Sequence, residues 1–251
     1  MDFKNKTVVI SGAGSGIGRS TAILFAMQGA NVVVSDISEK GGIETVELIK
    51  NKNGSAIFIK CNVAKFAEVE NLMNKTVEHF GAIDIAVNNA GIGGKSLQKT
   101  AEHPFDDWDE VIAVNQTGVF YCMKLEIQQM LKQGHGNIIN IASIAGLRGL
   151  PNNLSYVASK HAVVGMTKTA ALEYARKNIR VNAVCPVFTH SALFQQLLDS
   201  KEGLDQKLKM GIPMSRFGQP EEIGEAILWL TSDKSKFITG HALPVDGGMM
   251  A

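Results

Sequence analysis

Residues 7–19 read TVVISGAGSGIGR, a short β-branched run followed directly by a glycine-rich turn. The run has the composition of a buried strand, and the residues after Gly18 have the spacing of an amphipathic helix. Glycines let a backbone approach a pyrophosphate closely, and a helix N-terminus offers free N–H groups and the positive end of a dipole. The stretch therefore predicts a strand, a phosphate-binding loop and a helix; the alternative is an ordinary glycine-rich turn.

The spacing of the glycines narrows this prediction. Ile17 stands where the common dinucleotide-binding pattern has its third glycine, so that pattern is not matched. A variant pattern with glycines at Gly12, Gly16 and Gly18 is matched instead. We expect this loop to hold the pyrophosphate of a dinucleotide.

Similar strand-like runs recur along the chain, each followed by a stretch with helical spacing. They are continuously apolar, as expected for strands covered on both faces of a parallel sheet. The runs occupy residues 7–10, 32–34, 56–59, 83–87, 138–141 and 179–181, with an edge strand at 242–245, where Pro244 cannot donate to a ladder. This alternation predicts an α/β fold of one doubly wound, Rossmann-type domain over residues 1–251.

Two further features concern the connections. Several helices are expected to end at glycines that can adopt the left-handed conformation, namely Gly29, Gly54, Gly81 and Gly136. Residues 188–214 contain a helix-like stretch without a strand of its own. Long excursions of this kind are often lids, so we expect a substrate lid there.

The composition limits the possible partners and location. The 251 residues carry a formal net charge of +1, which gives no electrostatic reason to expect nucleic acid or an anionic membrane as a partner. The chain has no signal-peptide pattern and no apolar run long enough to span a membrane, so a cytoplasmic location is expected. The three cysteines are interpreted as reduced and buried, and the scattered histidines predict no metal site.

Asp36 follows the second strand-like run, eighteen residues after Gly18. A carboxylate there accepts hydrogen bonds from the adenosine ribose and repels a 2′-phosphate. Its expected neighbours Ser15 and Ile37 are not basic, and Arg19, the nearby cation, can equally be a surface residue. These residues favour NAD over NADP, although Asp36 could instead cap the next helix.

Tyr156 and Lys160 are four residues apart in a stretch with helical spacing, so they should share one helix face. A tyrosine with a pKa near 10 needs roughly 4 kcal/mol of preferential phenolate stabilisation to act near pH 7. A lysine ammonium one turn away, helped by a positive nicotinamide ring, can supply much of it. The phosphate loop upstream strengthens the interpretation of Tyr156 and Lys160 as a catalytic pair.

Two polar residues fit the same chemistry. Ser143 follows the run at 138–141, at the sheet edge where open α/β sheets bind their ligands. Asn115 is a polar residue in a stretch of otherwise helical periodicity, and the presence of a polar side chain at such a position usually has a structural or functional reason. Taken alone, Ser143 could be a cap and Asn115 a satisfied core amide.

The glycine loop, Asn88-Asn89-Ala90-Gly91, Asn115, Ser143, the Tyr156/Lys160 pair and Val245-Asp246-Gly247-Gly248 occur in one order and spacing. Over essentially the whole chain, this pattern resembles the short-chain dehydrogenase/reductase family. The resemblance implies a seven-stranded parallel sheet and a catalytic tetrad of Asn115, Ser143, Tyr156 and Lys160. Tyrosine would transfer the proton, lysine would bind the nicotinamide ribose and lower the tyrosine pKa, serine would orient the substrate oxygen, and asparagine would hold a water.

The resemblance also implies the cofactor contacts and the assembly. Members commonly form dimers or tetramers through the helices that carry Asn115 and Tyr156, and we expect a homotetramer. The implied contacts with NAD are Gly12, Ser15, Gly16, Ile17, Gly18, Asp36, Ile37, Asn62, Val63, Asn89, Ala90, Gly91, Tyr156, Lys160, Pro186, Val187 and Thr189.

Three positions depart from the family pattern. Ser11 replaces threonine and keeps the hydroxyl, and Asn62 replaces an aspartate that contacts adenine but keeps an acceptor oxygen. Val187 replaces a glycine, which predicts a differently shaped loop near the nicotinamide amide, around Thr189 and Ser191.

We therefore expect an NAD-dependent oxidoreductase that interconverts a small carbonyl compound and an alcohol. The alternatives are a 3-oxoacyl-carrier-protein reductase, a polyol, sugar or sterol dehydrogenase, and a nucleotide sensor without catalysis. An apolar pocket for uncharged ketones is predicted, with Arg148 as the nearby cation that could bind an acid instead. Its expected lining is Leu147, Leu150, Leu154, Val187, Phe188, Leu193, Phe194 and Leu197.

Overall fold

The protein is described by a computed structural model that covers residues 2–95, 97–191, 194–195, 198 and 203–251. Seven parallel strands form one sheet in the order β3-β2-β1-β4-β5-β6-β7. This confirms the predicted doubly wound sheet, and β7 is an edge strand as expected. The strands are β1 (Thr7–Ser11), β2 (Asn31–Asp36), β3 (Ser55–Lys60), β4 (Ile85–Asn88), β5 (Gly136–Ile141), β6 (Ile179–Pro186) and β7 (Ala242–Val245).

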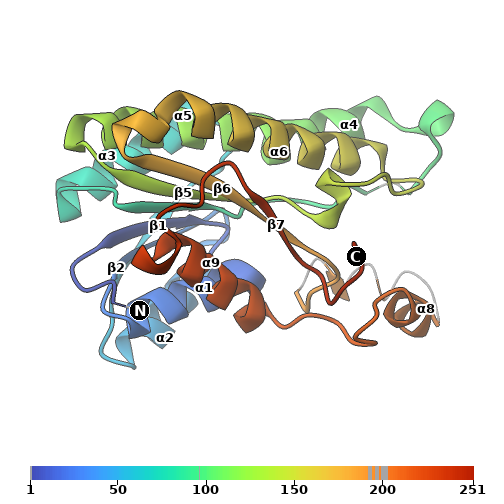
Figure 1. Cartoon of the computed structure of the whole chain (residues 1–251), viewed down its shortest axis with the longest axis horizontal. Helices are drawn as coiled ribbons and strands as arrows, with labels where there is room; N and C mark the ends of the chain where they lie inside the picture. Colours follow the sequence, from blue (N-terminus) through green and yellow to red (C-terminus); the bar gives the residue numbers. More distant parts are fainter. Residues whose placement is uncertain (1, 96, 192–193, 196–197, 199–202) are drawn as a thin grey trace.

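Helices cover both faces of the sheet (Figure 1). Helices α1, α2 and α9 lie on one face, and α3, α4, α5 and α6 lie on the other (Figure 1). The described helices of these layers are α1 (Gly16–Met27), α2 (Glu39–Lys50), α3 (Phe66–Phe80), α4 (Phe105–Ile112), α5 (Gly118–Gln133), α6 (Leu154–Tyr174) and α9 (Pro220–Thr231).

The core is divided by the sheet into two clusters. Alternate residues of one strand enter opposite clusters: Val9 packs on the α3, α5 and α6 side, whereas Val8 and Ile10 pack on the α1 and α9 side. Val8, Val9 and Ile10 are each at most 2% exposed. Burial on both faces is the reason that the first strand is continuously apolar in the sequence.

The helix ends match the glycine predictions only in part. Gly81 ends α3 in the left-handed conformation, with φ of 81°. Helix α5 ends at Gly134, with φ of 79°, and the predicted Gly136 instead begins β5. Helix α2 ends at Lys50, before Gly54, and the nearby left-handed residue is Asn53, with φ of 59°. Asparagine is one of the few residues that tolerates this conformation, so glycine was not required.

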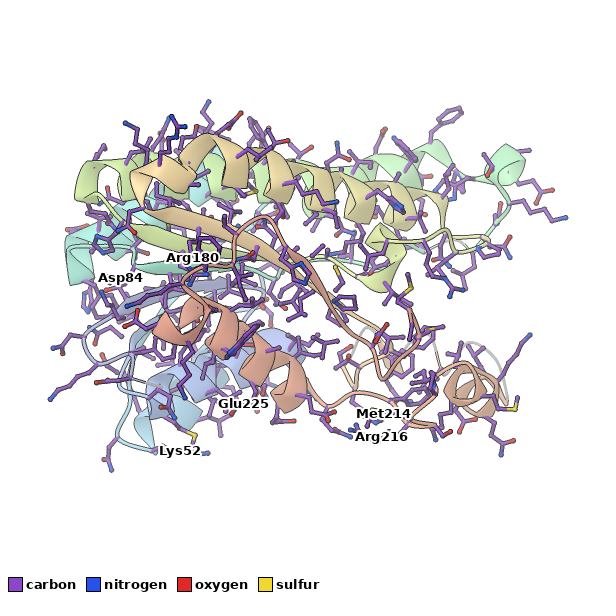
Figure 2. All side chains as sticks on the ribbon, in the orientation of Figure 1. Lys52, Asp84, Arg180, Met214, Arg216 and Glu225 are labelled. Carbon is purple, nitrogen blue, oxygen red and sulfur yellow. The ribbon has the colours of Figure 1, made fainter. Side chains whose placement is uncertain are left out.

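Described residues within 188–214, the predicted lid, contribute to a small separate apolar cluster. Phe194 is 7% exposed there and packs with Ile144, Ile212 and Phe217. The segment also contains α8 (Leu204–Met210), at the far end of the molecule from Asp84 (Figures 1 and 2). Leu193 and Leu197 lie outside the described residues, and the lid remains a prediction.

No helix among the described residues is long and apolar enough to cross a membrane. The same residues hold no cluster of three metal-ligating side chains.

Candidate active site

The glycine loop adopts backbone conformations that favour glycine. Gly12 and Gly16 have φ of 64° and 51°, a region that side chains rarely adopt. A Cβ on Gly18 would overlap the carbonyl oxygen of Gly12 and the amide of Asn89. Ser15 precedes α1 without a capping hydrogen bond from its side chain. The first N–H groups of α1 therefore have no side-chain cap and can bind an anion.

Ser11 and Asn89 tie this loop to the neighbouring strand. The Ser11 hydroxyl oxygen accepts hydrogen bonds from the N–H groups of Asn89 (3.1 Å) and Ala90 (3.2 Å). The Asn89 amide donates to the carbonyl oxygens of Ser11 (3.0 Å) and Gly12 (2.9 Å). These bonds hold the turn at Asn89, Ala90 and Gly91 against the glycine loop. At position 11 they use only a hydroxyl group and the backbone carbonyl, so serine can replace the threonine of the family pattern.

Asp36 is held at the end of β2 by two hydrogen bonds. Its carboxylate oxygens accept from the N–H groups of Gly14 (2.8 Å) and Ser38 (2.8 Å). Ser38 is the residue whose side chain caps α2, by accepting from Gly41, so the alternative of Asp36 as the side-chain cap of that helix is wrong. Ile37 beside it is 61% exposed.

Arg19, the cation nearest to Asp36 in the sequence prediction, is already engaged. Its guanidinium donates to Glu44 at 2.9 Å, to the Thr45 hydroxyl at 3.1 Å and to the Gly14 carbonyl oxygen. Its side chain is 25% exposed, so the alternative of a free surface residue does not hold.

Asn62 and Val63 follow β3 at the same edge of the sheet. The Asn62 side-chain oxygen accepts from the backbone N–H of Ala64 at 3.0 Å. The backbone N–H of Asn62 donates to the Glu68 carboxylate at 2.8 Å. The Val63 side chain is buried against Gly118. Contacts of these residues with an adenine remain predictions, and only one acceptor position of the Asn62 oxygen is taken by the chain.

Tyr156 and Lys160 lie on one face of α6, as their spacing predicts. The Lys160 ammonium is 5.7 Å from the centroid of the Tyr156 ring and donates to the Ile141 carbonyl oxygen at 2.8 Å. The Ser143 side chain hydrogen bonds to Tyr156. Ser143 also starts the turn η3 (Ile144–Gly146), where its hydroxyl accepts from the Ala145 N–H at 3.1 Å.

The pKa values of this pair differ from the prediction. Burial raises the pKa of Tyr156 above its usual value of 10, and the Ser143 hydrogen bond only partly opposes that effect. Burial also lowers the pKa of Lys160 from 10.5 to about 8. The groups of the chain therefore do not lower the pKa of Tyr156, because desolvation has a larger effect than the Ser143 hydrogen bond.

Asn115 lies in a single π-helical turn, η2 (Ala113–Thr117), between α4 and α5. Its side-chain oxygen accepts from the N–H of Ile92, and its amide donates to the carbonyl oxygen of the same residue, both at 2.8 Å. A Cβ on Gly91 would lie 3.2 Å from the Asn115 oxygen and 3.6 Å from the Lys160 nitrogen. Because glycine has no Cβ, Gly91 leaves space in which the side chains of Asn115 and Lys160 approach the same point. A π-helical turn, such as the one that carries Asn115, is frequent at functional sites.

Ser159 is a residue that the sequence analysis missed. It is fully buried, donates to the Tyr156 carbonyl oxygen at 2.8 Å and accepts from the Asn115 amide at 3.3 Å. It therefore links the helix of Tyr156 to the turn of Asn115. Its position directly before Lys160 was the available signal, but a serine within a helix is common.

The side chains at the end of β6 and directly after it are mainly buried. Val187 is 9% exposed and packs in the cluster with Ile144 and Phe194. The Thr189 hydroxyl is buried and donates to the Val187 carbonyl oxygen at 2.9 Å, so it is turned away from solvent. Pro186 pairs with Val245 at the end of the sheet. Cofactor contacts here stay predictions.

A hollow of about 230 Å³ lies beside the first turn of α6, next to Tyr156 in the sequence. Leu150 and Leu154 line it as predicted, whereas Phe188 stacks on Phe194, at 5.4 Å between ring centroids, and Leu147 packs on the main core. The lining is mainly apolar, with amide and hydroxyl groups as the smaller part, although of the predicted residues that the structure describes only Leu150 and Leu154 belong to it. The full lining is Gln98, Thr100, Gly149, Leu150, Pro151, Asn152, Asn153, Leu154 and Val157.

Comparisons with known proteins agree with this geometry. The family model described as enoyl-(acyl carrier protein) reductase matches residues 12–250. An uncharacterized oxidoreductase of Thermotoga maritima is 46% identical over 255 residues, covering 100% of both chains. A cyclohexanol dehydrogenase of an Acinetobacter species is 43% identical, over 98% of this chain and 95% of its own. A 3-oxoacyl-(acyl-carrier-protein) reductase of Staphylococcus epidermidis is also 43% identical, over 98% and 99%.

Two solved structures are similar over the whole fold. The crystal structure of levodione reductase matches with a TM-score of 0.95 at 33% identity, covering 98% of each chain. The structure of NAD⁺-bound xylitol dehydrogenase matches with a TM-score of 0.94 at 33% identity, covering 99% of this chain and 100% of its own. The extent of these matches, together with the sheet order and the site residues, shows that the chain belongs to the short-chain dehydrogenase/reductase family.

Proposed function

We propose that the protein is an NAD(H)-dependent oxidoreductase that interconverts an uncharged ketone and a secondary alcohol. The observation that carries this proposal is the meeting of Ser143, Tyr156 and Lys160 at the carboxyl edge of the sheet. Membership of an oxidoreductase family supports the reaction class.

The glycine loop fits a dinucleotide, because glycine backbone can approach a pyrophosphate closely and the first N–H groups of α1 have no side-chain cap. A bound nicotinamide supplies or accepts the hydride. In the reduction, the Tyr156 hydroxyl donates its proton to the substrate oxygen, which Ser143 orients. Lys160 holds positive charge near the phenolate that remains, and Asn115 fixes the turn at Gly91 and Ile92 through its hydrogen bonds.

Asp36 and Arg19 support a preference for NAD. The Asp36 carboxylate is oriented by Gly14 and Ser38, so it would face the ribose with a fixed negative charge that repels a 2′-phosphate. Arg19 is paired with Glu44, which reduces its capacity to attract that phosphate. One structural neighbour binds NAD⁺.

The hollow at the first turn of α6, which Leu154 and Val157 line, supports an uncharged substrate. Its lining carries amides, a hydroxyl and apolar groups, with no ionisable side chain. Arg148, the cation that could have bound an acid, is exposed. A carboxylate in this hollow would lose hydration without a charged partner. Relatives described as acting on cyclohexanol and levodione are in keeping with this class.

The second candidate is a 3-oxoacyl-carrier-protein reductase, because such enzymes are among the relatives. The deciding experiment measures kcat/KM for cyclohexanone, 4-phenylbutan-2-one, a 2-keto acid of similar size and an acetoacetyl thioester, each with NADH and NADPH. The proposal expects the uncharged ketones with NADH to be preferred. Preference for the thioester with NADPH would establish the second candidate, and preference for the keto acid would refute the uncharged-substrate class.

We further propose a cytoplasmic homotetramer in which residues 1–251 form one domain and 188–214 act as a lid. Exposed apolar side chains on α5 and α6, among them Phe120 at 49% and Leu172 at 85% exposure, support association through these helices. The cysteines Cys61, Cys122 and Cys185 are free and buried, in keeping with a reducing compartment. Light scattering should give four times the chain mass of 27.0 kDa; a monomer would refute the assembly.

A further inference from the structure

The connection between β4 and α4 passes close to the proposed substrate site. Gln98 and Thr100 from this connection line the hollow, opposite residues Leu154 and Val157 of the Tyr156 helix. Whatever holds these two side chains in place therefore also sets the shape of the hollow. The same connection contains a buried pair of side chains that the proposed reaction does not use.

The pair consists of His103 and Asp107, whose side chains are 3% and 4% exposed. The His103 Nε2 atom is 3.4 Å from the Asp107 Oδ2 atom, within ion-pair distance. Among the described residues, neither imidazole nitrogen of His103 has a hydrogen-bond partner, and Asp107 Oδ2 has none either. Polar groups so deeply buried nearly always have partners, so each of these two side chains has the other as its compensating contact.

Asp107 also contacts the first part of the connection between β4 and α4, at Gly94 and Lys95. Its Oδ1 atom accepts from the Lys95 N–H at 2.6 Å. Gly94 has φ of 82°, and a Cβ there would lie 3.1 Å from Asp107 Oδ2, so the backbone runs directly along the carboxylate. One carboxylate therefore faces both the start of this connection, at Lys95, and its end, at His103.

His103 transmits this contact to the hollow through its backbone. Its N–H donates to the Thr100 carbonyl oxygen at 3.4 Å and closes the turn η1 (Thr100–Glu102). Asp107 belongs to α4, which packs against α6 and against the Asn115 turn. His103 is thus connected to Thr100 through its backbone N–H and to α4 through the contact of its imidazole with Asp107.

We propose that His103 and Asp107 are positioning residues that hold Gln98 and Thr100 at the hollow and so determine specificity for substrates that extend into it. The proposal rests on the proposed ketone reductase function. A ketone that reaches the hollow should depend on the pair, whereas a small ketone that ends near Tyr156 should not. The cofactor should be unaffected, because the glycine loop and Asp36 make their contacts elsewhere.

The test compares butan-2-one with 4-phenylbutan-2-one, which share the reacting methyl ketone and differ in size. His103→Leu should lower kcat/KM for the larger ketone roughly tenfold, mainly through KM, and leave the smaller one within about threefold. His103→Gln should restore at least half of the loss, since its amide can donate to Asp107. His79→Leu, at an exposed histidine of α3, is the matched control and should change neither ketone.

Two further measurements separate positioning from general damage. NADH affinity of His103→Leu should equal that of the wild type, and amide exchange at Lys95 should quicken by about tenfold. Equal losses for both ketones, a parallel loss of NADH affinity, or no rescue by glutamine would overturn the proposal. If His103→Leu does not fold, Gln98→Leu takes its place and must show the same size-selective loss; an unchanged ratio of the two ketones would refute the proposal.

A wild-type protein that reduces neither ketone with either cofactor would refute the proposed function instead. The pair is then judged by exchange alone. Unchanged protection of the Lys95 amide in His103→Gln and His103→Leu would show that the pair does not hold the connection.

Discussion

Tyr156 illustrates at the scale of a single residue how far chemistry depends on surroundings. Its position four residues before Lys160 follows from the sequence, but its pKa does not, because burial raises that value in the free protein. A raised pKa keeps the hydroxyl protonated, which suits a proton donor in carbonyl reduction. For the reverse reaction a bound positive nicotinamide has to offset the effect of burial.

Tyr156→Phe should reduce turnover below a hundredth of the wild-type rate, because general acid catalysis typically contributes 10²–10⁴-fold. NADH binding should remain nearly unchanged, since only the hydroxyl is removed. Steady-state reduction of a ketone and a fluorescence titration with NADH measure the two effects. Residual activity above a tenth of the wild-type rate would remove Tyr156 from its proposed role.

Asp36→Ala should narrow the preference for NADH over NADPH by at least about tenfold in kcat/KM, since a fixed negative charge facing a 2′-phosphate is removed. NADH affinity should fall as well, because Asp36 also orients Gly14 and Ser38. Titration with both cofactors measures each effect.

Glu39→Gln is the matched control for this variant. It removes an exposed negative charge at the start of α2, 3.8 Å from Lys60, and leaves the bonds of Asp36 intact. Its cofactor preference should stay that of the wild type. If the wild type already uses NADPH as well as NADH, the interpretation of Asp36 is wrong.

At the scale of elements, a buried polar network joins β4, β5, α5 and α6. The Asn88 amide donates to Glu126 and to the Asn140 side-chain oxygen, both at 3.0 Å, and Asn140 donates to Thr167 at 2.9 Å. Glu126 is 1% exposed, and burial raises its pKa from 4.5 to about 8, partly opposed by the bond from Asn88. The carboxyl group therefore stays protonated in the folded chain at neutral pH.

This raised pKa makes stability depend on pH. In the unfolded chain Glu126 ionises above about pH 4.5, while in the folded chain it ionises only near pH 8, so stability should fall with rising pH between these values. Glu126→Gln removes this contribution and should raise the free energy of unfolding at pH 8 by on the order of 4 kcal/mol. Urea unfolding at pH 5 and pH 8 measures the difference.

Glu225→Gln is the matched control, because this glutamate is exposed on α9 (Figure 2). It should keep the wild-type dependence on pH. An unchanged slope in Glu126→Gln would show that Glu126 is not held protonated by the fold.

At the scale of the whole molecule, the sheet brings the ends of β1, β2, β4, β5 and β6 to one edge. A cofactor that spans this edge binds only the folded chain, so it should stabilise the whole structure. NADH at one hundred times its dissociation constant should add about 2.7 kcal/mol, which corresponds to roughly 5–10 °C in melting temperature for a chain of this size. Removal of NADH by dialysis should reverse the shift.

Differential scanning fluorimetry with NADH and NADPH at equal concentrations measures this effect. The proposal expects the larger shift with NADH. Equal shifts with both cofactors would contradict the proposed selectivity, and no shift with either would contradict dinucleotide binding.

The sequence by itself determined the alternation of strands and helices, the glycine loop and the shared helix face of Tyr156 and Lys160. These features depend on local periodicity and on backbone conformations that glycine adopts readily. Boundaries such as the end of α5 at Gly134 were missed because neighbouring glycines offer the same local freedom.

Only the tertiary structure decided which distant groups meet. The bonds of Asn115 to Ile92 and Ser159, of Arg19 to Glu44, and of Lys160 to the Ile141 carbonyl oxygen join residues 19 to 44 positions apart. The direction of the Tyr156 pKa and the inward turn of the Thr189 hydroxyl likewise follow from packing. The physical reason is that burial and partner choice are set by the way the helices pack on the sheet, and residue spacing along one element carries no record of that packing.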